Sequence, residues 1–273
     1  IGLIVDDISN FFFGHLARTV EEAAGEYGYT VMFCNSENNQ GKSRDVLGKL
    51  VDRQMDGYII APTIGMLPEI KNLLTAKKPV VMIDRYYENV PGSYVTIDNY
   101  QGAFDSVNLL IEKGYRNIGL VTNQTEQIQI VDRLKGYKNA LKKNNLPFNK
   151  ELVKKIPFKY NEERIVDVLV EYLGSNDHID AVLFTSNNLG IPGLESIRKV
   201  KKKVPGDIAV ICFDDNDLFR LASPGISVVS QPIKAIGREA IKILLDQIEN
   251  IAIQEKHVVL APNLIIRDST PGK

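Results

Sequence analysis

The stretch IGLIVDDISNFFFGHLARTVEEAAGEYGYTVMFC, residues 1–34, decides the fold class. A short apolar run at 1–6 is followed by a polar turn, an amphipathic segment and a second apolar run at 30–34. The amphipathic segment begins near Phe12 and carries apolar residues at helical spacing: Leu16, Val20, Ala23, Ala24 and Tyr27. A strand, a helix and a strand in this order predict a βαβ unit with parallel strands.

The same alternation repeats along the chain. Apolar runs rich in Val and Ile predict strands covered on both faces at 1–6, 30–34, 57–62, 79–84, 117–122, 180–185 and 208–213. Amphipathic segments predict helices at 40–54, 100–113, 130–145, 161–173, 189–201 and 233–249. This pattern predicts an α/β protein with parallel sheets and helices on both faces.

The series of strands and helices restarts near the middle of the chain. EYGYTVMF (26–33) and EKGYRNIGLV (112–121) share a junction of helix, Gly-Tyr and strand, in which Gly28 and Gly114 would end the helices in a left-handed conformation. No linker rich in Pro, Gly or Ser separates the two halves. We therefore expect two similar lobes joined by short crossings, which suit a hinge.

Composition narrows the class of protein. The 273 residues carry 33 Lys and Arg against 34 Asp and Glu, a balance that argues against nucleic-acid binding by this segment itself. Both cysteines, Cys34 and Cys212, lie in apolar runs, so we expect buried free thiols and a reducing, cytoplasmic location. No apolar run is long enough to span a membrane. The chain opens directly on a strand, so we expect further sequence upstream.

Enzyme and metal signatures are missing from the sequence. Neither G-x-G-x-x-G nor G-x-x-x-x-G-K-[ST] occurs, and His15, His178 and His257 are isolated from one another and from nucleophiles. The pair Asp214–Asp215 could suggest acid–base chemistry, but neighbours in sequence do not necessarily share a site. We expect a non-catalytic protein without metal or cofactor.

Polar residues follow several predicted strands, where open α/β sheets bind ligands. They are Asp84 and Arg85, Asn187 and Asn188, and Asp214 and Asp215, with Arg133 at the beginning of a predicted helix. Each has a structural alternative: Asp214 or Asn187 could cap the next helix, and Arg133 could be a solvated charge. Together, carboxylates, amides, a guanidinium and aromatic rings suit a neutral polyhydroxyl ligand.

Three phenylalanines, Phe11, Phe12 and Phe13, stand in the turn after the first strand. Such a position is a poor one for filling the core between sheet and helix. The residues either cap that core locally or line a binding site.

The motifs resemble, over essentially the whole chain, the effector-binding domain of the lactose-repressor family of bacterial transcription regulators. The matching phrases are the opening stretch, MDGYIIAPT, PVVMIDR, VTIDNYQGA, DRLKGY, and FDD followed by SPGISVVSQPIKAIGREAIKILL. The resemblance implies the periplasmic-binding-protein type I fold: two lobes, a cleft that holds the effector, and three crossings, here near Gly114, Gln231 and Lys256. The implied lobes are 1–114 with 232–256, and 115–231 with 257–273.

The resemblance also implies roles for particular residues. Phe12 and Phe13 would form one wall of the effector pocket, Arg133 would grip the effector, and Asp214 would be the acidic cleft residue. The remaining implied ligand-binding residues are Asn187, Phe158, Gln231 and, at the border of the cleft, Asp98 and Gln101. The chain departs from the family pattern at Phe11, Asn188, Ile191-Pro192 and Cys212.

The resulting functional hypothesis is the effector sensor of a dimeric DNA-binding repressor. The effector would be a sugar or a sugar-like molecule, and the helix-turn-helix domain that the family carries is absent from this sequence. Candidate dimer surfaces are the helices expected at 40–54 and 65–76 in the first lobe and the segments near 190–201 and 218–228 in the second. The alternative is a periplasmic sugar-binding protein of an importer, which shares the fold; the upstream sequence, a helix-turn-helix or a secretory signal, distinguishes the two.

Overall fold

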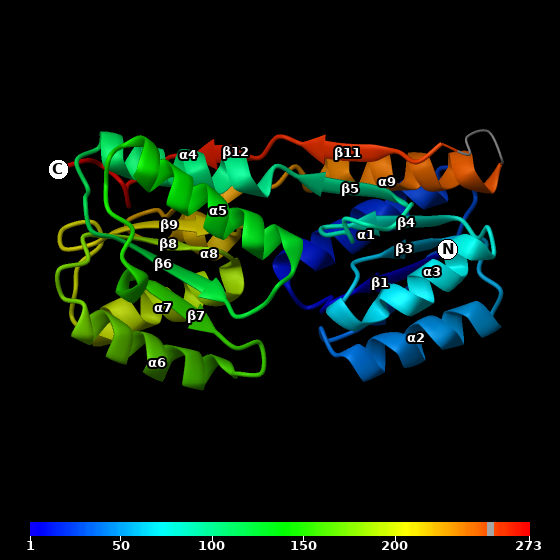
Figure 1. Ribbon diagram of the computed structural model, residues 1–273, viewed down its shortest axis with the longest axis horizontal. Helices are drawn as coiled ribbons and strands as arrows, with labels where there is room; N and C mark the ends of the chain where they lie inside the picture. Colours follow the sequence, from blue (N-terminus) through cyan, green and yellow to red (C-terminus); the bar gives the residue numbers. More distant parts are fainter. Residues whose placement is uncertain (250–253) are drawn as a thin grey trace. The chain divides into compact units, whose positions relative to one another are not determined.

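The computed structural model describes residues 1–249 and 254–273, which form two compact units. Unit 1 comprises Ile1–Ile97 and Pro232–Leu260, and unit 2 comprises Asp98–Gln231 and Ala261–Lys273. Each unit is a six-stranded sheet with helices packed on it (Figure 1). The predicted α/β class, with mostly parallel strands, is confirmed.

Unit 1 has an entirely parallel sheet in the order β11-β5-β4-β3-β1-β2. Its strands are β1 (Gly2–Val5), β2 (Met32–Asn35), β3 (Tyr58–Ile60), β4 (Val80–Ile83), β5 (Ser93–Ile97) and β11 (His257–Leu260). Its helices are α1 (Phe11–Gly25), α2 (Gln40–Asp52), the 3-10 helix η1 (Ile64–Met66), α3 (Leu67–Thr75) and α9 (Ile233–Ile248).

The central strands of unit 1 are buried on both faces, as their apolar runs predict. Helix α1 packs with α9, and α2 and α3 cover a separate cluster of sheet side chains. That cluster joins Leu47 and Leu50 of α2 and Ile70 of α3 to Ile4 and Ile60 of the sheet.

Unit 2 has the sheet order β12-β10-β9-β8-β6-β7, parallel except for the antiparallel edge strand β12. Its strands are β6 (Ile118–Asn123), β7 (Val153–Ile156), β8 (Ala181–Phe184), β9 (Ala209–Phe213), β10 (Ser227–Ser230) and β12 (Asn263–Ile265). Its helices are α4 (Asn99–Glu112), α5 (Ile128–Lys143), the 3-10 helix η2 (Lys150–Leu152), α6 (Glu162–Ser175), α7 (Asn187–Lys199) and α8 (Asp217–Leu221).

The two sheets have the same plan. Strands β1, β2, β3, β4, β5 and β11 of unit 1 correspond in position to strands β6, β7, β8, β9, β10 and β12 of unit 2. The pair α4–α5 in unit 2 corresponds to the pair α9–α1 in unit 1. The chain enters unit 2 at α4, before any strand of that unit. It returns to unit 1 at α9, after most strands of that unit.

The boundaries between the units differ from those that we expected. The structure divides the chain after Ile97, not near Gly114, because α4 packs against α5 of unit 2. The two helices are so close that a Cβ placed on Gly136 of α5 would lie 2.3 Å from the carbonyl oxygen of Tyr100 in α4. The second division follows Gln231. The third follows Leu260, not Lys256, since β11 pairs with β5 of unit 1.

Each predicted strand and helix exists with ends shifted by a few residues, but the prediction missed several elements. The missed elements are β5, β7, β10, β11, β12 and the short helix α8, whereas α3 (Leu67–Thr75) was expected as a helix at 65–76. Tyr27 is a wrong core assignment: it lies beyond the end of α1 and is 64% exposed. Gly28 and Gly114 have φ of +79° and +95°, which confirms the left-handed junctions.

No helix in the described part of the chain has the length and apolar character required to cross a bilayer. Within residues 1–249 and 254–273 there is likewise no group of three or more His, Cys, Asp or Glu side chains that could hold a metal ion.

Candidate functional site

The carboxyl edge of the unit 1 sheet carries a buried guanidinium, Arg85, directly after β4. Its Nη2 donates to Asp6, which follows β1, and its Nη1 lies 3.1 Å from Asp84 Oδ2. Its Nε donates to the carbonyl of Pro62, after β3, at 2.6 Å. One side chain thus ties together the loops that follow three strands.

The electrostatic environment of Arg85 explains how a buried cation is retained. Burial lowers the pKa of its guanidinium, but the carboxylates of Asp6 and Asp84 more than offset this, so that the pKa is raised overall. Asp84 has a φ of +65°, and its carbonyl accepts a hydrogen bond from Thr96 Oγ1 at 2.9 Å. Aspartate tolerates this left-handed conformation better than most residues.

The first loop of unit 1, between β1 and α1, is held at several points. Asn35 Oδ1 accepts from the Ile8 amide at 3.1 Å, and Asp7 accepts from the Ser9 hydroxyl. Asn10 caps α1, accepting from the Phe12 amide at 2.9 Å. These contacts, together with the Asp6–Arg85 ion pair, fix the start of α1.

The three phenylalanines of this loop have different environments. Phe12 and Phe13 are buried, at 4% and 8% exposure, with their rings 5.0 Å apart in an edge-to-face arrangement. Phe11 is half-buried and contacts the ring of His15, 4.2 Å away. The structure therefore groups Phe12 with Phe13 and separates Phe11 from them.

In unit 2, Arg133 lies in α5 and is 3% exposed, so it is not a solvated surface charge. Its Nε donates to Asn99 Oδ1 at 2.8 Å, and its Nη1 donates to the Thr185 carbonyl after β8. Its guanidinium carbon lies 4.0 Å from the centroid of the Phe213 ring. Because α5 begins at Ile128, Arg133 is in its second turn and not, as predicted, at its beginning.

Asp214 directly follows β9, and its carboxylate is hydrogen-bonded to Gln231, the residue that directly follows β10. Gln231 Nε2 donates to Asp214 Oδ1 at 2.6 Å, and both residues are 8% exposed. Asp214 has a φ of +69° and does not cap the next helix, since Asn216 performs that role for α8. The adjacent Asp215 is engaged separately by Arg267.

The other predicted residues are more dispersed. Asn187 is the first residue of α7 and 4% exposed; Ser186, not Asn187, precedes the helix as its cap residue. Asp98 caps α4 by accepting from the amide of Gln101, whose own side chain is exposed and bonds to Asp105. Phe158 lies between β7 and α6 and is 46% exposed, so in this structure it is not part of an enclosed wall.

Sequence reasoning missed several residues at these edges. Asn99 and Asp6 were not singled out, although they pair with Arg133 and Arg85. The position of Asp6 directly after a buried strand was the available signal. Cys212 is fully buried beside Gly190, where a Cβ would lie 2.2 Å from its Sγ, and burial raises the pKa of its thiol well above the usual value.

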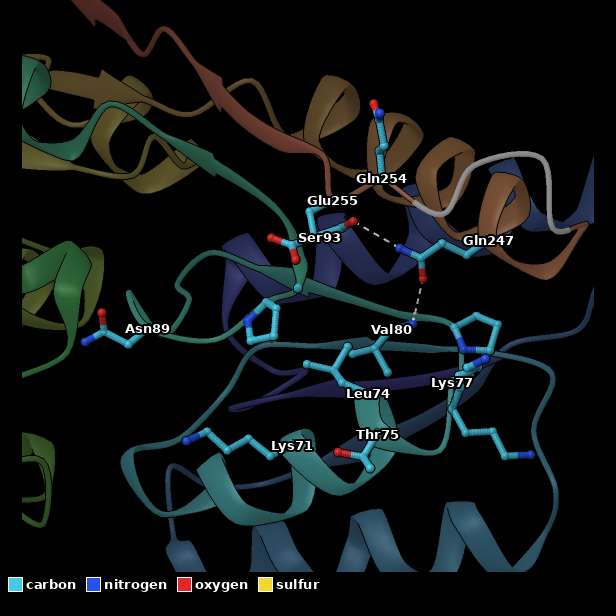
Figure 2. A pocket seen from close by; sticks show the side chains of 14 residues that line it. Lys71, Leu74, Thr75, Lys77, Val80, Asn89, Ser93, Gln247, Gln254 and Glu255 are labelled. Carbon is cyan, nitrogen blue, oxygen red and sulfur yellow. Dashed lines mark hydrogen bonds between the residues drawn. The ribbon is translucent and has the colours of Figure 1, made fainter.

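A pocket of about 750 Å³ lies at the opposite, amino edge of the unit 1 sheet (Figure 2). Its floor includes Val80 and Ser93, the first residues of β4 and β5. Gln247 bridges them, accepting from the Val80 amide at 2.8 Å and donating to Ser93 Oγ at 3.0 Å. The pocket contains none of the predicted ligand-binding residues.

Comparison with known proteins identifies the family. Residues 107–270 match the family model described as periplasmic binding protein-like domain. The HTH-type transcriptional regulator RegA of Clostridium saccharobutylicum is 30% identical over 275 residues, which cover 99% of this chain and 81% of that protein. The ribose operon repressor of Halalkalibacterium halodurans is also 30% identical, over 100% of this chain and 80% of the relative. The chain belongs to the lactose-repressor family.

Solved structures of lactose-repressor-family regulators share the fold. A putative ribose operon repressor from Burkholderia thailandensis has a TM-score of 0.88 and 26% identity, covering 97% of both chains. The complex of the regulator CelR with cellobiose has a TM-score of 0.88 and 26% identity over 98% of this chain and 83% of that one. This chain is accordingly the effector-sensing domain of a transcription regulator, and these relatives leave the importer-protein alternative less supported.

Proposed function

We propose that the chain binds a sugar or a sugar-like molecule at the carboxyl edges of its two sheets, and that binding controls the attachment of the regulator to operator DNA. The observation that carries this proposal is the arrangement of Arg133, Asp214 and Gln231 in unit 2. Relatives at 30% identity include a ribose operon repressor, and a structural relative at 26% identity is a cellobiose complex. These names support a carbohydrate as the ligand.

The geometry of Arg133 favours ligand binding over a purely structural charge. Asn99, the Thr185 carbonyl and the Phe213 ring hold the guanidinium in a fixed orientation, so little side-chain entropy remains to be lost when a ligand binds. Asp214 Oδ1 is occupied by Gln231, whereas Oδ2 makes no hydrogen bond within the described residues. A ligand hydroxyl can donate to that oxygen in a charge-assisted bond.

Phe12, Phe13, Phe158 and Asn187 complete the proposed set, with Asp98 and Gln101 at its border. Aromatic rings suit the C–H faces of a sugar, and the amide of Asn187 can both donate and accept. We propose that the regulatory step is a population shift: a ligand that binds one conformation of the chain more tightly than another favours that conformation. That shift changes the spacing of the DNA-binding segments of two subunits.

A ligand screen tests the proposed function. The 273-residue chain is heated with ribose, glucose, cellobiose, adenosine and their phosphates, and its unfolding temperature is recorded. A true effector at about 100 times its dissociation constant stabilises the chain by about 2.7 kcal/mol. Isothermal titration calorimetry then gives the affinity. If no sugar or nucleoside binds, the proposal is wrong.

We further propose that the chain forms a homodimer and acts in the cytoplasm. The predicted dimer segments carry exposed apolar side chains: Val51 on α2, and Leu218 and Leu221 on α8, the last 70% exposed. Leu218 and Leu221 are neighbours on one short helix, and adjacent exposed apolar side chains mark a candidate contact surface for a partner. Sedimentation at tens of micromolar tests the dimer. DNA binding is assigned to a helix-turn-helix segment outside this sequence, so the 273-residue chain alone should not bind an operator specifically.

A further inference from the structure

The loops at the carboxyl edge of unit 1 are strongly acidic. The loops after β1, β2, β3 and β4 contain a single cation, Arg85. Their carboxylates are Asp6, Asp7, Glu37, Asp84 and Glu88. Glu37 is paired with Lys42 of α2, which leaves the acidic groups in excess over Arg85.

The cation is less exposed than the two carboxylates that pair with it. The side chain of Arg85 is 5% exposed, compared with 18% for Asp6 and 10% for Asp84. The guanidinium is thus the least exposed of the three charged groups. Two carboxylates against one guanidinium leave the Asp6–Arg85–Asp84 cluster with one net negative charge.

The carboxyl edge of unit 2 carries charges of both signs. Arg133 is a cation at the carboxyl edge of its sheet, but Asp214 follows a neighbouring strand at the same edge. Both charges act on the Cys212 thiol: burial is the largest influence on its pKa, Asp214 raises that pKa and Arg133 lowers it. The carboxyl edge of unit 2 thus carries a carboxylate beside its cation and is not a purely cationic edge.

We propose that the acidic cluster makes this sensor selective for uncharged polyhydroxyl ligands over their phosphorylated forms, and that Asp6 is the specificity-determining residue. The inference rests on the proposed function. Asp6 Oδ1 accepts from Arg85 and Ser36, whereas Oδ2 makes no hydrogen bond within the described residues. A sugar hydroxyl donates to such an oxygen, but the oxygens of an ionised phosphate are acceptors and carry like charge.

Calorimetry on matched pairs tests the inference. The pairs are ribose and ribose 5-phosphate, glucose and glucose 6-phosphate, cellobiose and cellobiose 6-phosphate, and adenosine and its 5′-monophosphate. Within the pair that binds, we expect the neutral member to bind roughly 10- to 100-fold more tightly, given one net charge at close range in a medium of intermediate dielectric constant. The ratio should shrink between about 0.05 and about 0.5 M NaCl because salt screens the repulsion.

Two isosteric variants separate charge from shape. Asp6→Asn and Asp84→Asn each remove one negative charge, and asparagine tolerates the positive φ of position 84. We expect each variant to reduce the ratio several-fold. Asp56→Asn is the matched control, since Asp56 is exposed and precedes β3 at the opposite edge of the same sheet. A strand of this length spans roughly 10 Å, beyond the Debye length of about 8 Å at physiological salt.

The outcomes separate this inference from the proposed function. A phosphate that binds as tightly as its neutral partner overturns the selectivity while leaving the sensor function intact. If the neutral ligand is preferred but neither salt nor either variant changes the ratio, the preference is steric, and this result also overturns the inference. If no member of any pair binds, the proposed function fails and this inference fails with it. If Asp6→Asn does not fold, the salt dependence of the unmodified chain and the Asp84→Asn variant still test the charge-based selectivity.

Discussion

Gln231 donates a hydrogen bond to Asp214, 2.6 Å from Nε2 to Oδ1, and the next residue in the chain, Pro232, already belongs to unit 1. The proposed acidic ligand contact is thus one hydrogen bond away from a crossing between the units. A ligand that draws Asp214 toward itself acts directly on the residue that leads into that crossing, which gives the population shift a physical origin.

Replacing Gln231 tests this link. Gln231→Leu keeps the approximate volume but removes the donor that orients Asp214. Because a hydrogen bond of this kind contributes about 1–2 kcal/mol, we expect the best effector to bind roughly 5- to 30-fold more weakly. Calorimetry measures the change. Unaltered affinity in a folded variant would show that the orientation of Asp214 does not matter for binding.

Arg133→Ala should weaken the effector roughly 10- to 150-fold, since charge-assisted hydrogen bonds contribute about 1.5–3 kcal/mol each. It should also destabilise unit 2, because Asn99 loses a buried partner. Lys142→Ala is the control: Lys142 lies on the same helix and is exposed, so its removal should change neither quantity. Wild-type affinity in a folded Arg133→Ala variant would remove Arg133 from the site.

Asp214→Asn should weaken the effector as strongly as Arg133→Ala while leaving the fold nearly unchanged. Asparagine accepts the φ of +69° and retains an oxygen that can accept from Gln231. Asp214→Ala adds backbone strain of about 1–2 kcal/mol to the loss of charge. Comparing the two variants by urea denaturation and calorimetry separates binding from conformation. Equal stabilities would contradict the strain argument.

Phe12→Ala should lower the free energy of unfolding by about 3–5 kcal/mol, because Phe12 is 4% exposed and its truncation leaves a cavity. Phe11→Ala, at a half-buried position one residue earlier, should cost much less. Urea denaturation of the two variants side by side provides the measurement. A smaller loss of unfolding free energy for Phe12→Ala than for Phe11→Ala would contradict the assignment of Phe12 as the more deeply buried ring.

Alkaline pH should destabilise the fold through buried tyrosines. Burial raises the pKa of Tyr87 to about 12, and it also raises the pKa values of Tyr58, Tyr137 and Tyr172 above 10. A pKa that is higher in the folded than in the unfolded chain contributes stability below about pH 10, and this contribution disappears as the pH rises toward 12. Ultraviolet titration should show these phenols ionising last, together with unfolding.

Leu221→Glu should dissociate the proposed dimer, since a charge at a 70% exposed side chain disrupts an apolar interface but leaves the monomer intact. Tyr27→Glu is the matched control: Tyr27 is 64% exposed and lies outside the candidate dimer segments. Sedimentation gives the association state of each variant. A dimer that survives Leu221→Glu would move the interface elsewhere.

Burial explains part of the outcome of the sequence prediction. The runs of β1, β3, β4, β8 and β9 are buried along their whole length, so they read as continuous apolar stretches. The edge strands β7, β11 and β12 are partly exposed and contain polar residues, which hid them in the pattern. Helix α4 was assigned to the wrong lobe because a sequence does not reveal which partner a helix packs on.

The sequence by itself determined the alternation of strands and helices, the left-handed glycines at 28 and 114, and the family. It also placed Arg133, Asp214 and Gln231 among the candidates. Only the tertiary structure decided that Asp6 meets Arg85, 79 residues away, and that Arg133 meets Asn99 and Thr185. The physical reason is the order of strands in each sheet: it brings together loops that are distant in the chain, and local periodicity carries no information about that order.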